Sequence, residues 1–280
     1  MSDTPWIAGQ AVAGTLAFGA VAWQARRIRQ GNEVAQRALI ASEAVAIDAA
    51  RARLDAQAPP VTVRLTDAAW PPHGASQFGV IAGEWPAGYE WHFPAKESER
   101  IVLQARVLVE NLAPQQYVSV EYGGNLIREK DGRRQPVRPA VLWPSGKSTV
   151  SQNLFLHKDF TIKELSENYE ARQEGRPLPH RVTGTVTVHE RRDNGVTDTW
   201  ELELTGCPVR PDRTRSGIWV VDTESGVDSL EFESHPTHQR TYWLSRRRGE
   251  RLPEPTYRSG DTDERPGVPW WRPGPRRRVG

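Results

Sequence analysis

The sequence predicts a mainly β protein, in which an N-terminal transmembrane helix and a helical stalk precede an antiparallel β-sandwich with one inserted helix and a disordered C-terminal tail. Three patterns support this fold class: an uncharged run near the N-terminus, a stretch of strong helix formers after it, and apolar residues that alternate with polar ones through the middle of the chain. The predicted parts are an anchor with a basic flank (1–29), a stalk (30–60), a sandwich (61–245) and a tail (246–280).

The predicted anchor is the uncharged run from Pro5 to Ala25. A helix needs about 20 predominantly apolar residues to cross a bilayer, and this run has that length. The residues expected at the two membrane surfaces are Trp6, Trp23, Arg26, Arg27 and Arg29. Because arginine-rich flanks stay in the cytoplasm, we expect a single-pass protein of the cell membrane, with its N-terminus outside and its sandwich in the cytoplasm. A buried helix of a soluble bundle is the alternative.

The predicted stalk contains strong helix formers and ends before Pro59 and Pro60, because proline pushes the preceding residue out of helical geometry. Its apolar positions recur near heptad spacing, but most of them are alanine. Self-association through the stalk, or through small residues of the anchor such as Ala13 and Ala17, is one expected kind of contact.

Alternation with a period of two begins after the prolines. Val61, Val63 and Leu65 alternate with polar residues, which predicts a strand with one buried face. Residues 101–109 repeat this pattern over a longer strand. Further strands are expected at 117–122, 218–222, 230–233 and 240–244.

The strongest local signal is a hairpin formed by residues 181–189 and 199–205. Valines on the first strand share a face with Trp200, Leu202 and Leu204, while threonines and glutamates cover the other face, and Asp193-Asn194-Gly195 supplies the turn. One helix interrupts the strands, because the residues from Thr161 to Glu164 form a capping box that opens a helix running to about Gln173. Many short strands with one inserted helix indicate a sandwich, for which an immunoglobulin-like topology is one option.

Composition limits the function. The net charge of +2 gives no overall field that would attract nucleic acid, and Cys207 alone can form neither a disulfide framework nor a cysteine zinc site. Among the basic residues arginine outnumbers lysine, which is typical of GC-rich bacterial genomes. We find no catalytic motif, cofactor motif or metal-ligand spacing, so the sequence predicts no enzyme, no cofactor and no small-molecule substrate.

The expected function is therefore that of a binding or interaction module with a protein partner. The candidate contacts are aromatic side chains from a Pro- and Gly-rich stretch and from the tail: Trp85, Tyr89, Trp91, Phe93, Trp270 and Trp271. The opposite interpretation is that the rings from the Pro- and Gly-rich stretch close the ends of the sandwich as core residues. One alternative function is an extracytoplasmic protein that binds cell-wall glycan through exposed tryptophans. The other is a soluble scaffold that oligomerises around a buried N-terminal helix.

Overall fold

A computed structural model describes residues 4–75, 81–86, 88–130, 133–144, 153–190, 195–244 and 249–255. The chain divides into two compact units. One contains residues 1–52 and 253–280, and the other contains residues 53–252. The second unit, which begins eight residues before the predicted sandwich, holds every strand among the described residues and is called the β domain below.

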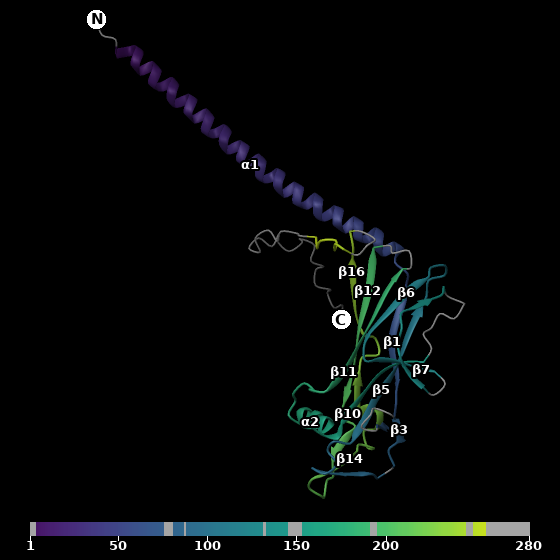
Figure 1. The fold of residues 1–280 in the computed structure, drawn as a ribbon. Coiled ribbons are helices and arrows are strands. Elements are labelled where there is room, and N and C mark those ends of the chain that lie inside the picture. The colour runs from purple at the N-terminus through teal and green to yellow at the C-terminus, as the bar shows by residue number, and fades with distance from the viewer. Residues whose placement is uncertain are drawn as a thin grey trace, which may run out of the picture. The chain divides into compact units, whose positions relative to one another are not determined.

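Helix α1 (Thr4–Gln57) joins the predicted anchor and stalk in one continuous helix (Figure 1). It ends just before Pro59 and Pro60, which cannot continue a helix. Within the described part of the chain, no helix combines the length and the apolar character needed to cross a membrane. The predicted transmembrane helix is therefore not supported, because alanine, glycine and residues such as Gln10 and Gln24 lower the hydrophobicity of the run.

The largest sheet has the strand order β3-β2-β5-β10-β7-β8, and β1 pairs with β5 beside β2. All of its pairs are antiparallel. Its strands are β1 (Val61–Ala68), β2 (His73–Ala75), β3 (Ile81–Glu84), β5 (Arg100–Asn111), β7 (Leu126–Lys130), β8 (Arg133–Pro136) and β10 (Leu154–Thr161).

The second sheet has the order β15-β12-β11-β6-β9, and β16 also pairs with β12. Its strands are β6 (Val118–Gly124), β9 (Ala140–Leu142), β11 (Arg181–Glu190), β12 (Val196–Gly206), β15 (Leu230–Phe232) and β16 (Thr237–Tyr242). A small third sheet contains β4 (Glu90–His92), β13 (Val209–Pro211) and β14 (Ile218–Val221), and a short 3-10 helix, η1 (Gly226–Ser229), precedes β15.

The two larger sheets contribute to one hydrophobic core, in a sandwich-like arrangement. The predicted hairpin is confirmed as β11 and β12, with Val186 opposite Trp200 and Val182 opposite Leu204. These four side chains are buried, as the alternation predicts, while the predicted turn residues Asp193 and Asn194 lie outside the described residues. The immunoglobulin-like topology remains a prediction.

Helix α2 (Ile162–Gln173) begins at the predicted capping box. Ile162, Leu165 and Ala171 are buried, so one side of the helix packs against the rest of the β domain. Gly175, with a φ of +67°, follows the last turn and lets the chain leave the helix without the steric cost that a side chain would carry there.

Candidate functional site

The aromatic segment that the sequence singles out lies at the small third sheet. Trp91 is the central residue of β4 and is 0 % exposed. Trp85 and Tyr89 pack on it, with ring centroids 5.1 and 5.4 Å from that of Trp91. Phe93 stacks on Trp219 at 5.6 Å. These rings belong to the core or pack against it, and the Trp91 side chain is not available to a ligand in this structure.

The other predicted contact residues are not brought to this segment. Trp270 and Trp271 lie outside the described residues, and so does the side chain of Trp6. Trp23 is exposed on α1, with the Arg27 guanidinium 5.2 Å from its ring centroid. The flanking residues Arg26 and Arg29 are exposed as well, so their assignment to a membrane surface remains a prediction.

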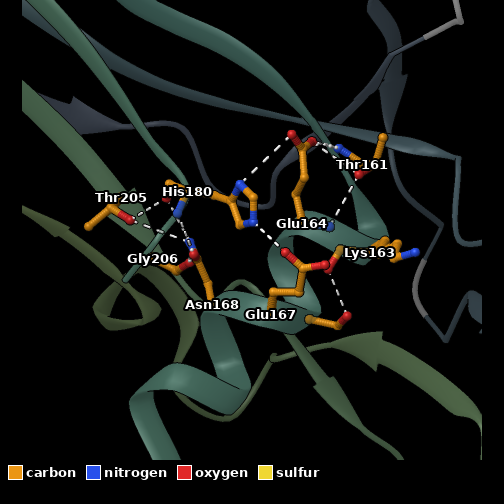
Figure 2. A network of polar contacts seen from close by, with 9 residues as sticks. Thr161, Lys163, Glu164, Glu167, Asn168, His180, Thr205 and Gly206 are labelled. Carbon is orange, nitrogen blue, oxygen red and sulfur yellow. Dashed lines mark hydrogen bonds and ion pairs between the residues drawn. The ribbon is translucent and has the colours of Figure 1, made fainter. Parts of the chain in front are cut away.

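A polar network surrounds the first turns of α2 (Figure 2). Thr161 Oγ1 accepts a hydrogen bond from the Glu164 backbone N–H at 3.1 Å, and Glu164 Oε2 accepts one from the Thr161 backbone N–H at 2.7 Å. The His180 ring lies between two carboxylates, with Nε2 2.6 Å from Glu167 and Nδ1 3.8 Å from Glu164. The network therefore joins the start of α2 to the residue that precedes β11.

Asn168 is the buried centre of this network. Its Nδ2 donates to the backbone carbonyls of His180 at 2.8 Å and Gly206 at 3.0 Å, and its Oδ1 accepts from the His180 backbone N–H at 2.9 Å. The Thr205 hydroxyl also donates to the His180 carbonyl, at 2.7 Å (Figure 2). Because its donors and acceptors are satisfied, Asn168 holds α2, β11 and β12 together and has no capacity left for a ligand.

A second charged cluster lies on β12 and β16. Arg240 donates to Asp198 through Nε at 2.6 Å and Nη2 at 2.8 Å, and its Nη1 donates to Asp55 at 2.8 Å. His238 Nε2 lies 2.8 Å from Asp198, and the Tyr242 hydroxyl donates to Asp55 at 2.9 Å. Hydrogen bonding to Asp198 raises the pKa of Arg240 above its ordinary value. This cluster is internally paired, and we assign it a structural role.

A pocket of about 640 Å³ lies on the outer face of the second sheet. Thr183 and Thr185 of β11 and Glu201 and Glu203 of β12 form one part of its lining. These four side chains are exposed, because they alternate with buried residues along their strands. The opposite part comes from the end of β15, the start of β16 and the connection between them, including Phe232, Glu233 and Pro236.

The pocket lies where the pairing of β12 is interrupted. Strand β16 pairs with β12 from Val196 to Glu201, and β15 pairs with it from Leu204 to Gly206. Within the described residues, no strand pairs with Leu202 or Glu203 on this side. The β15–β16 connection turns away here, and its Ser234 carbonyl accepts a hydrogen bond from the Leu65 N–H of β1 at 3.2 Å. Residues 233–236 of the connection thus lie opposite only Leu202 and Glu203 of β12, which makes a bulge in the edge beside the pocket.

Alternation of the backbone identifies the residue that faces this bulge. On the β15–β16 side, the Gly195 carbonyl accepts from Trp243, and the Cys207 N–H donates to Ser229. Backbone groups of successive strand residues point to opposite edges, so odd-numbered residues of β12 point to this side. Glu203 therefore directs its N–H and C=O toward the β15–β16 connection, where the pairing of Leu204 with Phe232 sets the Glu233 N–H against the Glu203 carbonyl.

Four glutamates line the pocket, and two of them have cationic partners. Glu203 lies 3.1 Å from Arg181, and Glu231 pairs with Arg172. In the part of the chain that the structure describes, Glu201 and Glu233 form no ion pair. The pocket therefore carries an excess of negative charge.

No protein-family model matches the chain, and no curated protein matches it. Among the described residues, no group of three or more histidine, cysteine, aspartate or glutamate side chains is arranged to hold a metal ion. Function must therefore be inferred from the geometry of the β domain itself.

Sequence analysis placed the threonines and glutamates of the hairpin on its outer face but did not select them as a site. The alternation of residues 181–189 and 199–205 is the signal that could have found half of the pocket. The other half depends on the path of residues 233–236, for which the sequence carries no comparable pattern.

Proposed function

We propose that the β domain is a non-enzymatic binding module, and that its protein ligand occupies the pocket between β11, β12 and the β15–β16 connection. The observation that carries the proposal is that this pocket joins exposed threonine and glutamate side chains of the sheet to the partly buried Phe232 ring and to Pro236 in one hollow. Concave sites that combine apolar area with a few polar groups are recurrent sites of ligand recognition.

The lining supports binding rather than chemistry. The threonine hydroxyls and glutamates offer hydrogen-bond and charge contacts, and Phe232 and Pro236 offer apolar area. By contrast, the aromatic segment around Trp91 supplies packing for the core, which gives no support to a glycan site built on that ring.

A pocket-filling variant tests the proposal. The full chain, Thr183→Trp and Gln239→Trp are applied to an array of random peptides and to a glycan array. Thr183 lines the pocket, whereas Gln239 is exposed on β16 of the same sheet outside it, so the second variant controls for an added tryptophan. We expect peptide binding that Thr183→Trp abolishes and Gln239→Trp retains. Peptide binding that both variants retain, or binding to glycans alone, would contradict the proposal.

A further inference from the structure

We infer that helix α1 pairs with α1 of a second copy of this chain, and that the two helices run antiparallel. The contact spans residues 25–49, which is about 36 Å of helix, and its centre lies at Arg37. The inference does not depend on the ligand proposed for the β domain. Three features of α1 carry it: an exposed face with a heptad repeat, the order of residue sizes along that face, and the distribution of charge.

The face follows a heptad repeat without a break. Residues alternately three and four positions apart lie on one side of a helix, which is the spacing of a coiled-coil seam. Ile28 and Leu39, the largest side chains of this seam, are 63 % and 70 % exposed. A helix gains most of its stability from packing of such a face, so a partner is expected to cover it. The seam consists of eight residues, all exposed: Ala25, Ile28, Asn32, Ala35, Leu39, Ser42, Ala46 and Ala49.

The order of residue sizes along the seam fits an antiparallel partner. In an antiparallel pair centred on Arg37, two residues face each other when their numbers add to 74. Each large side chain then meets an alanine of the second copy, and the two polar residues meet each other, so the layers fill evenly. A parallel pair in register would instead set alanine on alanine in alternate layers and leave them poorly filled. The antiparallel layers are Ala25–Ala49, Ile28–Ala46, Asn32–Ser42 and Ala35–Leu39.

The charges on α1 favour the same orientation. Residues 26–37 contain four arginines and one glutamate, whereas residues 38–50 contain two acidic residues and no basic one. An antiparallel pair sets the basic segment of each copy against the acidic segment of the other, while a parallel pair sets like charges together. Beside the seam, Arg29 lies opposite Glu43 of the second copy. Both side chains are exposed, and within the described residues neither forms an ion pair, so both are available for this contact.

Sedimentation velocity of the full chain at increasing concentration tests for the dimer. We expect a monomer–dimer equilibrium that Ile28→Gln/Leu39→Gln weakens by at least about tenfold, because both large residues of the seam are lost. The matched control is Trp23→Gln/Val34→Gln. Those side chains are similarly exposed, at 61 % and 64 %, but lie off the seam, so this variant should dimerise like the unmodified chain.

Two results of that measurement would overturn the inference. One is a chain that stays monomeric up to about 100 μM, a concentration at which even a weak specific dimer is populated. The other is an equal loss of dimer in the two double variants, which would mean that the seam is not the contact. Far-UV circular dichroism of all variants shows that α1 keeps its helical structure.

An exchange of charges tests the orientation. Arg29→Glu and Glu43→Arg should each weaken the dimer by about fivefold, because like charges then face each other twice. Arg29→Glu/Glu43→Arg should restore the original affinity, since each ion pair is rebuilt with its signs reversed. In a parallel dimer the two residues are about 21 Å apart, so a double variant that does not recover would contradict the antiparallel pair.

Disulfide formation reads the orientation directly. Cys207, which is the only cysteine, is replaced by serine, and chains with Ala25→Cys are mixed with differently tagged chains with Ala49→Cys. The antiparallel pair brings residue 25 of one copy to residue 49 of the other, so mild oxidation should link the two kinds of chain to each other. Disulfides between chains of the same kind would indicate a parallel pair and overturn the inference.

Discussion

Arg240 binds Asp198 through two hydrogen bonds, from Nε to Oδ1 at 2.6 Å and from Nη2 to Oδ2 at 2.8 Å. The two residues lie on adjacent strands, β12 and β16, and the Asp198 side chain is only 7 % exposed. A carboxylate at such a position is stable only while a cation neutralises it.

Arg240→Gln should therefore lower the free energy of unfolding of the β domain by about 2–4 kcal/mol, because the substitution leaves the Asp198 carboxylate buried without its cation. Urea unfolding at neutral pH measures the change. The control is Arg213→Gln, which breaks an exposed pair with Glu224 and should cost less than about 0.5 kcal/mol. Similar small losses in both variants would show that the Asp198 pair is not a structural requirement.

Asn168→Ala should destabilise the β domain by about 2–4 kcal/mol. The substitution removes the partner of the His180 backbone N–H and of the Gly206 carbonyl, and buried backbone groups without partners are costly. Glu167→Gln, which alters an exposed side chain bound to His180, should cost less than about 1 kcal/mol. Urea unfolding measures both changes, and equal losses of unfolding free energy in Asn168→Ala and Glu167→Gln would contradict the prediction.

The free energy of unfolding of the β domain should decrease as the pH is lowered from 6.5 to 4, and His157 should contribute to that decrease. Burial lowers the pKa of His157 to about 4, and the neighbouring Arg134 guanidinium also lowers it. In this window the unfolded chain, with an ordinary histidine pKa, binds a proton that the folded domain excludes, so acid favours unfolding.

Urea midpoints measured between pH 7 and pH 4 test this contribution. His157→Gln should reduce the pH dependence, whereas His235→Gln should not, because His235 is exposed. Carboxylates that titrate in the same window act equally in all three proteins, so the difference isolates the histidine. An unchanged slope in His157→Gln would contradict the prediction.

Cys207 should react slowly with a thiol reagent such as DTNB while the domain is folded. Its side chain is buried, and burial raises the pKa of the thiol to about 11, so little thiolate is present at pH 8. Addition of urea should make the reaction fast. As a control, Cys207→Ser/Ser225→Cys carries its thiol at an exposed position and should react quickly in the folded state. Fast labelling of native Cys207 would contradict the structure around it.

Local patterns in the sequence predicted the elements whose signals lie within one segment. The hairpin of β11 and β12, the long strand β5 and the capped helix α2 all appear where alternation and the Thr161–Glu164 box place them. Shorter strands such as β4 and β13 were missed, because three residues are too few to show a period. The predicted transmembrane helix is not supported for a related reason, since the length of an uncharged run says less than its composition.

The candidate site was harder to predict than the fold. The sequence directed attention to exposed aromatic residues, but Trp91 is a core residue, because tryptophan supplies large apolar area equally well to a ligand or to a core. The pocket residues Thr183 and Glu201 carry no motif, and their surface becomes a site only when the β15–β16 connection closes one side of it.

By itself, the sequence determined the local properties of the chain. These include the end of α1 before Pro59, the start of α2 at Thr161, and the alternating faces of β11 and β12. Each depends on the backbone and side chains of a few adjacent residues. Only the tertiary structure decided that Arg240 neutralises Asp198, that Trp91 is buried, and that the β15–β16 connection bulges opposite Leu202 and Glu203 of β12. These relationships join residues far apart in the chain, so they depend on strand register and loop paths that no local pattern encodes.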